Sequence, residues 1–142
     1  MLSRLSAISR YFTSSAAAQN SSNMSVKNFV EDTITSHKIT VFSKSYCPYC
    51  RRAKTLFKDK YPDADIGVIE LDERDDGSDI QEYLRQKTGQ GTVPNIFISE
   101  LPSFIPIRVY KLTSSTDQQH IGGCDDTMSL QNSGKLAGLI TA

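Results

Sequence analysis

Hydrophobic residues recur along this chain with two spacings, and these predict alternating helices and strands. Val26, Phe29, Val30 and Ile34 lie three or four positions apart, which predicts one buried helix face over about 25–36. Short apolar runs that contain β-branched residues instead predict strands. Strands are expected at residues 38–43, 66–71, 93–98 and, as a short fourth, 120–121. Further helices are expected at 47–60, from 78 to 89, from 125 or 126 through 130, and at 133–140.

Cap residues support several of these boundaries. Ser78 and Gln81 have capping-box spacing, and Gly89 is expected to end the helix that starts there. Asp125 or Asp126 is expected to cap the next helix. Strands that alternate with helices predict the α/β class, with a four-stranded mixed sheet flanked by helices on both faces and the last two strands antiparallel. At 142 residues and 38% hydrophobic content, the chain is expected to form one domain with a modest core.

The segment Cys47-Pro48-Tyr49-Cys50 joins an expected strand to an expected helix. A cysteine at a helix N-terminus faces the positive end of the helix dipole, which lowers the thiol pKa toward roughly 3.5–7.5. Lys44, Arg51 and Arg52 add positive charge nearby. Cys50 lies one helical turn from the first cysteine, close enough to close a disulfide. The segment therefore predicts a reversible dithiol redox site.

A zinc site is the alternative for the same two cysteines, since His120 and Cys124 have the spacing of two further ligands. The position of the pair between strand and helix favours the redox interpretation. The three cysteines cannot form a closed disulfide framework, and an odd count with one such pair is typical of a reducing compartment. Cys124 is expected to fill space beside a double glycine; glutathionylation or a link between two chains are its alternatives.

Charge and hydropathy exclude some classes of function. Lys and Arg together number 16, as do Asp and Glu, so no bulk charge favours nucleic acid or an anionic membrane. No apolar stretch approaches the roughly 18–20 residues that span a bilayer. We therefore expect a soluble protein with neither of these partners. A monomer is also expected.

Residues 1–23 differ in composition from the rest of the chain. They hold Arg4 and Arg10, no acidic residue and many Ser and Ala, with apolar residues at helical spacing. This composition predicts an amphipathic mitochondrial presequence; a disordered Ser-rich tail is the alternative. The core domain is expected at 24–142, and a second start at Met24 is expected to give a cytoplasmic form.

Three motifs together resemble one known family. Tyr46-Cys47-Pro48-Tyr49-Cys50, Thr92-Val93-Pro94 and Gly122-Gly123-Cys124-Asp125-Asp126 have the order and spacing found in dithiol glutaredoxins, small thiol oxidoreductases of the thioredoxin fold. The resemblance covers about 25–99 and 118–141 and is nearest to the fungal members. The Pro-Tyr pair between the cysteines separates glutaredoxins from thioredoxins, which have Gly-Pro there. The resemblance implies a thioredoxin-like fold.

The resemblance also implies an activity. In the family, the first cysteine attacks a glutathione mixed disulfide and a second glutathione releases it, which makes Cys47 the expected nucleophile. Cys50 is the expected resolving thiol, needed when the substrate is a protein disulfide, because exchange passes through a mixed disulfide. Glutathione is the expected co-substrate, with no metal. The expected partners are glutathionylated or disulfide-bonded proteins and, indirectly, the glutathione reductase system.

The glutathione contacts are implied residue by residue. A cis bond before Pro94 is expected to turn the Val93 backbone, after Thr92, toward the peptide; an ordinary trans proline is the alternative. Free N–H groups at Gly123 and Cys124 are expected to hold the γ-glutamyl carboxylate. The remaining expected contacts are Asp125 for the γ-glutamyl ammonium, Lys44 and Gln81 for the glycine carboxylate, and Tyr49 for the pocket wall. Helix capping is the alternative role for Asp125, and a solvated surface position is the alternative for Lys44 and Gln81.

The chain departs from the family pattern in two places. Gly91 stands where many members have a basic residue, which predicts weaker glutathione binding. Residues from 99 to about 118 replace a hairpin loop that usually has 2–5 residues. A gene-model artefact such as a translated intron is the first explanation for this insertion. A genuine surface loop that contacts a partner is the second.

Two other functions stay open at this point. Some glutaredoxins bridge an iron–sulfur cluster between two chains with the first cysteine and two glutathiones. Pro48 argues against this for the present chain, because members that hold clusters usually carry a small residue there or lack the second cysteine. A catalytically dead scaffold, inactivated by the insertion, is the other possibility.

Overall fold

The computed structural model describes residues 15–99 and 118–141. The expectations for residues 1–14 and for the insertion at 100–117 lie outside the described residues. The elements in chain order are α1 (Ser15–Ser36), β1 (Ile39–Ser43), α2 (Pro48–Lys60), β2 (Ile66–Glu70), the 3-10 helix η1 (Leu71–Glu73), α3 (Gly77–Thr88), β3 (Asn95–Ser99), β4 (Gln118–Gly122), α5 (Cys124–Asn132) and α6 (Lys135–Thr141).

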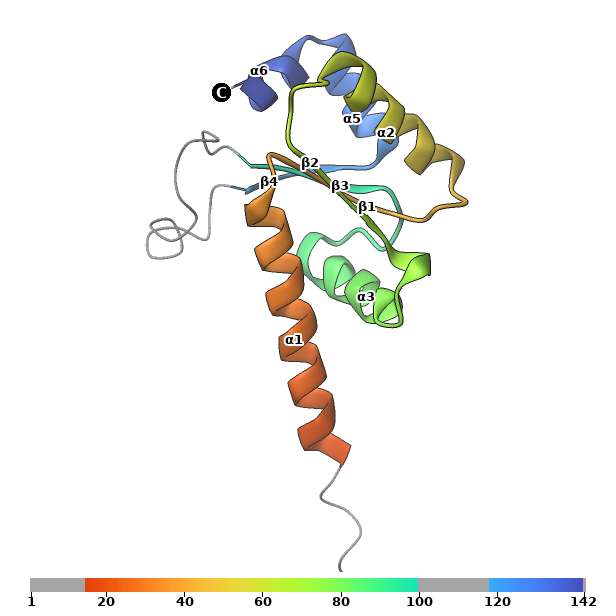
Figure 1. Cartoon of the computed structure of the whole chain (residues 1–142), viewed down its shortest axis with the longest axis vertical. Helices are drawn as coiled ribbons and strands as arrows, with labels where there is room; N and C mark the ends of the chain where they lie inside the picture. Colours follow the sequence, from red (N-terminus) through yellow and green to blue (C-terminus); the bar gives the residue numbers. More distant parts are fainter. Residues whose placement is uncertain (1–14, 100–117, 142) are drawn as a thin grey trace, which may run out of the picture.

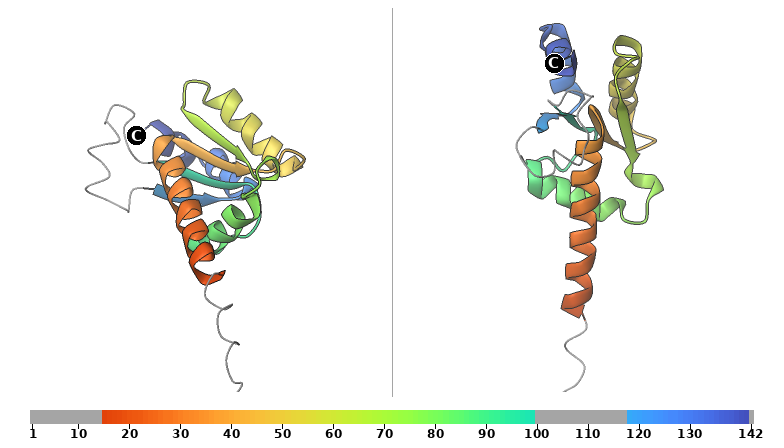
Figure 2. Two further views of the ribbon diagram at one scale, coloured as in Figure 1. Left: turned by 60° about the horizontal axis from the view of Figure 1, so that its bottom comes forward. Right: turned by 60° about the vertical axis from the view of Figure 1, so that its left-hand side comes forward.

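The strands form one four-stranded sheet in the order β2-β1-β3-β4. β1 pairs parallel with β2 and antiparallel with β3, and β3 pairs antiparallel with β4. Helices α2, α5 and α6 lie on one side of the sheet, and α1 and α3 lie on the other (Figure 1; Figure 2). The predicted mixed sheet, flanked by helices on both faces, is confirmed.

Alternation along β1 divides the core into two clusters, because successive side chains of a strand point to opposite faces. Ile39 and Val41 pack with Ala53 and Phe57 of α2. Phe42 packs on the other face, with side chains of α1 and α3 and edge-on against Phe97, with ring centroids 6.0 Å apart. Burying side chains of this size contributes about 1.5–3 kcal/mol each. Both faces of the sheet are therefore held by apolar packing.

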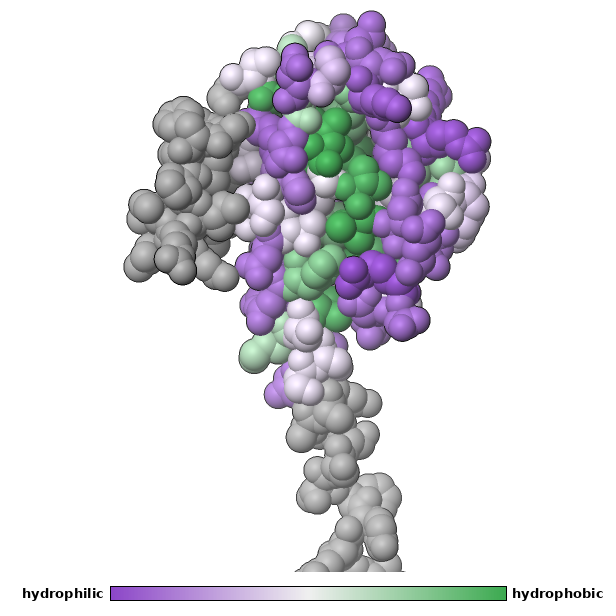
Figure 3. Space-filling model, viewed as in Figure 1, coloured by the Kyte–Doolittle hydropathy of each residue, from purple (hydrophilic) through white to green (hydrophobic). Residues whose placement is uncertain are grey.

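Hydrophilic residues cover most of the visible surface, and hydrophobic residues gather in one band across it (Figure 3). Val68, on the edge strand β2, is 40% exposed. Within the described residues, no helix combines the length and apolar character needed to cross a membrane.

Helix α1 begins ten residues before its expected start, at Ser15 instead of 25. The sequence Ala16-Ala17-Ala18 supplies strong helix formers. Residues 20–25 are exposed, and Val26 is the first buried residue among the side chains of α1 that the structure describes, from Asn20 onward. The apolar spacing therefore identified the packed half of α1, while propensity continues the helix beyond the domain (Figure 1).

The predicted start of α3 is wrong in its cap. The helix begins at Gly77 after Asp76, and no side chain caps it. The Asp76 carboxylate instead accepts from Arg74 Nε at 2.7 Å. Gln81, the expected capping-box partner, donates to the Gly91 carbonyl at 2.7 Å. The predicted end is confirmed, since Gly89 has a φ of 78° and follows the last helical residue.

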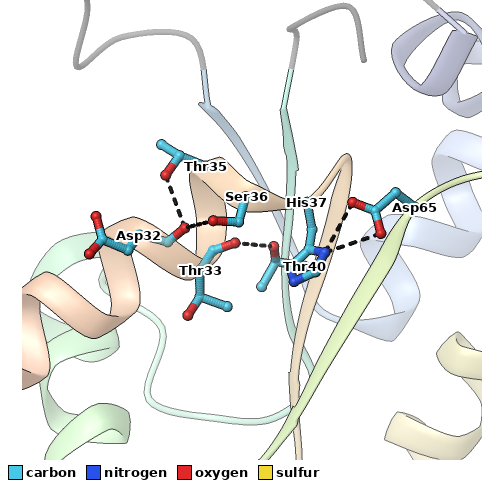
Figure 4. A network of polar contacts seen from close by, with 7 residues as sticks. All are labelled: Asp32, Thr33, Thr35, Ser36, His37, Thr40 and Asp65. Carbon is cyan, nitrogen blue, oxygen red and sulfur yellow. Dashed lines mark hydrogen bonds and ion pairs between the residues drawn. The ribbon is translucent and has the colours of Figure 1, made fainter. Parts of the chain in front are cut away.

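The junction between α1 and the sheet is held by polar contacts (Figure 4). His37 Nδ1 contacts both carboxylate oxygens of Asp65, at 3.0 and 3.2 Å. The Thr40 hydroxyl donates to the Thr33 carbonyl at 3.3 Å. The His37 ring also lies against Gly67 of β2, where an added Cβ would approach Cδ2 to 2.2 Å. These contacts fix the chain as it leaves α1 and enters β1.

Candidate active site

The two cysteines lie at the N-terminus of α2. Cys47 is the N-cap residue, with extended backbone (φ −79°, ψ 120°), and Pro48 occupies the first helical turn. Proline is tolerated there because its missing N–H has no partner inside the helix. The Cys47 sulfur accepts a hydrogen bond from the Cys50 N–H at 3.4 Å. The thiol therefore takes the place of a capping oxygen and faces the positive end of the helix.

The environment of Cys47 favours its thiolate. Partial burial alone raises the pKa of the Cys47 thiol, but hydrogen bonds from the Cys50 N–H and thiol and from the Tyr49 N–H outweigh it. The positive charge of Lys54 acts in the same direction, so the pKa lies below its ordinary value. The sequence analysis named Lys44, Arg51 and Arg52 for this role.

Cys50 has the opposite environment. Its side chain is 0% exposed, and burial raises the pKa of its thiol to about 11. A hydrogen bond from the Lys44 backbone and one from the Ser43 side chain lower this pKa, while hydrogen bonding to Cys47 and the charge of that thiolate raise it, and burial outweighs them all. At neutral pH the pair is therefore asymmetric, with one accessible thiol prone to ionise and one buried, protonated thiol.

The loop before β3 lies opposite Cys47. The Val93–Pro94 peptide bond is cis, as expected. The Val93 carbonyl accepts from the Cys47 thiol at 3.9 Å, which places this backbone beside the sulfur, while Thr92 is exposed. Gln90, which the sequence analysis did not identify, braces the loop by donating to the Thr92 and Pro94 carbonyls at 3.0 and 2.9 Å.

The double glycine lies at the start of α5. Gly122 has a φ of 110°, and Gly123 is the N-cap residue. The Gly123 N–H donates to Asp126 Oδ2 at 3.0 Å. Capping by Asp125 is therefore wrong: the third helical position, Asp126, can reach back to the N-cap, while Asp125 is exposed.

Cys124 points into the core. Its side chain is 4% exposed and packs in the cluster that contains Ile96 and Leu136. Burial raises the pKa of its thiol. The charges of Arg52, Asp125 and Cys47 make smaller contributions to this pKa. Cys124 therefore lies close to the dithiol. The structure thus supports a space-filling role for the thiol.

Asp72 holds the loop before the dithiol, and no sequence signal marked it. Its Oδ1 accepts from the Ser45 N–H at 2.8 Å, and its Oδ2 accepts from the Ser45 hydroxyl. These hydrogen bonds, with a smaller contribution from the charge of Lys44, lower the pKa of the Asp72 carboxyl. Tyr49, the expected pocket wall, is 59% exposed.

The alternative zinc ligands are not gathered. His120 Nε2 lies 2.9 Å from Asn95 Oδ1, and its ring packs against Phe97 with centroids 5.1 Å apart. In the part of the chain that the structure describes, no three His, Cys, Asp or Glu side chains are placed to hold a metal ion.

Comparisons with known proteins identify the family. The family model described as Glutaredoxin matches residues 39–101. Glutaredoxin-1 of the fungus Rhizophagus irregularis is 39% identical over 117 residues, which cover 82% of this chain and 96% of the relative. The chain belongs to the glutaredoxin family. Glutaredoxin-C4 of Arabidopsis thaliana is 44% identical over 115 residues, covering 80% of this chain and 69% of the relative. Plant members thus match as well as the fungal one.

Solved structures agree with this assignment. A crystal structure of a buckwheat glutaredoxin–glutathione complex has a TM-score of 0.68 and 36% identity, covering 85% of this chain and 92% of the other. The fold is thus the thioredoxin-like fold that the resemblance implied. Glutaredoxins are glutathione-dependent oxidoreductases, and this protein is an enzyme of that class.

Proposed function

We propose that this glutaredoxin reduces glutathione mixed disulfides and protein disulfides, with Cys47 as nucleophile and Cys50 as resolving thiol. The observation that carries the proposal is the asymmetry of the pair. The pKa of Cys47 is lowered at an accessible helix N-terminus, while that of Cys50 is raised to about 11 by burial. Thiolate is the attacking form, so the first attack belongs to Cys47.

The reaction follows from this assignment. The Cys47 thiolate attacks the glutathione sulfur of a mixed disulfide, the old S–S bond breaks, and the substrate leaves as a thiolate that takes a proton from solvent. A second glutathione thiolate then attacks the glutathionyl sulfur on Cys47 and leaves as glutathione disulfide, which glutathione reductase recycles. With a protein disulfide, Cys50 attacks the Cys47 sulfur instead and releases the substrate thiol.

The same residues form a path for an extended peptide. We assign the backbone of Val93, with Thr92 and Pro94 around it, to pair with glutathione by strand addition. The 3.9 Å contact between Cys47 Sγ and the Val93 carbonyl supports this, because it places the pairing groups beside the reacting sulfur.

The two ends of glutathione carry charge. We assign the γ-glutamyl end to the N–H groups of Gly123 and Cys124 and to the exposed Asp125 carboxylate, at the positive end of α5. The Gly123 N–H already donates to Asp126 Oδ2 at 3.0 Å, so glutathione must displace the Asp126 carboxylate to bind there. We assign the glycine carboxylate to Lys44 and Gln81, and the pocket wall to Tyr49. Gln81 already donates one N–H to the Gly91 carbonyl, and its amide carries a second.

The test is glutathione-dependent reduction of a small mixed disulfide, coupled to glutathione reductase, in the full chain and in C47S and C50S. We expect C47S to abolish turnover and C50S to keep it while losing reduction of a protein disulfide. Turnover in C47S equal to that of the unaltered chain would refute the assignment. A brown, cluster-bearing dimer from anaerobic purification would instead favour the iron–sulfur function.

For location, we propose mitochondrial targeting by residues 1–23 and a cytoplasmic form from Met24. The two arginines and the lack of acidic residues in 1–23 support this. A form beginning at Met24 retains Val26, Val30 and Ile34, the buried residues of α1. A fusion of residues 1–23 to a fluorescent protein should reach mitochondria, and diffuse fluorescence would refute the proposal.

A further inference from the structure

Helix α2 carries an excess of positive charge. It holds five Lys or Arg residues and one acidic residue, although the whole chain has 16 of each kind. Lys54 reaches across to β2 and pairs with Glu70 at 2.5 Å. In the part of the chain that the structure describes, no ion pair engages the other four cations, Arg51, Arg52, Lys58 and Lys60. Their charge is therefore available to another molecule.

Three of these cations line a groove between α2 and α5, two helices that pack together on the same face of the sheet (Figure 1). This α2–α5 groove has a volume of about 420 Å³, a size at which proteins bind ligands. Leu56 and Met128 line it and are half-buried. The other lining residues are exposed, namely Pro48, Arg51, Arg52, Thr55, Asp59 and Lys60. The groove thus combines half-buried apolar side chains with exposed side chains of net positive charge.

The α2–α5 groove begins beside the nucleophile. Pro48, which lines the groove, follows Cys47 directly in the chain, and Lys60 ends α2. Between Pro48 and Lys60 the helix rises about 18 Å, which is the reach of about five residues of extended peptide. The glutathione path assigned above runs over the loop before β3 and the start of α5. The protein half of a mixed disulfide must therefore pass over another surface next to Cys47, and the groove is such a surface.

We propose that the α2–α5 groove binds the segment beside the reactive cysteine of a protein substrate, and that it selects acidic segments that contain an apolar residue. Carboxylates of the segment pair with the exposed cations Arg51, Arg52 and Lys60. The apolar side chain packs on Leu56 and Met128. This inference rests on the proposed function, because it names the class of protein substrate that the same nucleophile reduces.

Two synthetic peptides serve as probes. Each has a central glutathionylated cysteine with about five residues on either side, the length that the groove accommodates. In the first peptide, one leucine on each side stands among glutamates, and in the second, glutamines replace the glutamates. The full chain reduces both in the assay coupled to glutathione reductase. We expect the KM for the glutamate peptide to be about tenfold lower at low salt, as two or three exposed ion pairs would make it. Added salt should shrink this ratio, because it screens exposed charges.

K60E tests the α2–α5 groove, and K58E is its matched control. Both lysines are exposed and lie in the last turn of α2, but only Lys60 lines the groove. We expect K60E to lower the ratio of the two KM values from about ten to about two, since it replaces one exposed ion pair with a repulsion. K58E should keep the ratio. Replacing the leucines of the glutamate peptide with serine should raise its KM about threefold, because apolar burial is lost.

A small glutathione mixed disulfide, which has no polypeptide to fill the groove, separates this inference from the proposed function. No turnover of this compound by the unaltered chain would refute the proposed function. Turnover of it, together with equal KM values for the two peptides, would overturn the groove proposal alone. An equal fall of the ratio in K60E and K58E would also overturn it, since the attraction would then belong to the whole helix. An unchanged KM for the serine peptide would overturn the contact with Leu56 and Met128.

Discussion

Substituting Gly122 with alanine should destabilise the fold through two separate effects. Its φ of 110° lies where side chains are strained, at a cost of roughly 1–2 kcal/mol. The new Cβ would also lie 2.4 Å from Asp126 Oδ2, so the carboxylate must move. Displacing it breaks the 3.0 Å hydrogen bond from the Gly123 N–H, and losing such a cap costs about 1 kcal/mol. We expect G122A to lower the free energy of unfolding by about 2–3 kcal/mol.

Gly134 offers a matched control, because its φ is 74° and no atom lies within 4 Å of an added Cβ. G134A should therefore show the backbone cost alone, about 1–2 kcal/mol. Urea denaturation measures the free energy of unfolding of both variants. D126A and the double variant G122A/D126A complete a double-mutant cycle. The double variant should lose less stability than the sum of the losses in G122A and D126A. Equal losses in G122A and G134A would refute the contact with Asp126. G122A should also raise the KM for a glutathione mixed disulfide, since Gly123 and Cys124 begin α5.

Three further results are expected. G91K should lower the KM for the mixed disulfide about two- to fivefold, which is the contribution of one exposed ion pair to binding. The lysine can be accommodated because only the flexible Arg85 side chain, 3.2 Å from the new Cβ, must shift. An unchanged KM would contradict this. Alkylation of Cys47 should be faster than that of free cysteine at pH 7 and should slow as pH falls through its lowered pKa, since protonation removes the thiolate; a profile like that of free cysteine would refute the environment described. Y61F should cost about 1 kcal/mol in urea denaturation, because it removes the 2.6 Å hydrogen bond to Gln131; no loss would show that the bond is not formed in solution.

Much of the fold was predictable because apolar spacing reports burial. The packed half of α1 followed from Val26, Val30 and Ile34, which are all buried. Boundaries were less predictable. The capping box at Ser78 failed because Asp76 and Arg74 pair with each other before the helix starts. The predicted start of α1 was wrong because the helix propensity of the residues before Val26 extends that helix without tertiary packing.

The residues of the site also differ in how well the sequence predicts them. The positions of Cys47 and Cys50 followed from a local motif, since strand, turn and helix are consecutive in the chain. Asp72 could not be found, because it acts through the Ser45 N–H, which lies 27 residues away in the chain and is brought near by the fold. Gln90 acts on carbonyls only two and four residues further along, but its side chain reaches them only in the bent conformation of the cis-proline loop. Lys54 lies seven residues after Cys47, two helical turns away, and nothing local distinguishes it from the other cations of that helix.

The register of β3 and β4 explains how the site can stay intact although the chain departs from the family at the insertion. Ser99 and Gln118, at the two ends of the insertion, lie opposite each other, as do Ile98 and Gln119. The irregularity in this pairing lies at Ile96/Phe97, beyond these pairs, and β4 still ends at Gly122. Hairpin register is set by the pairing that closes it, so a short turn or a long segment can join the same two residues. The double glycine therefore ends β4 and begins α5 with either kind of connection between the strands.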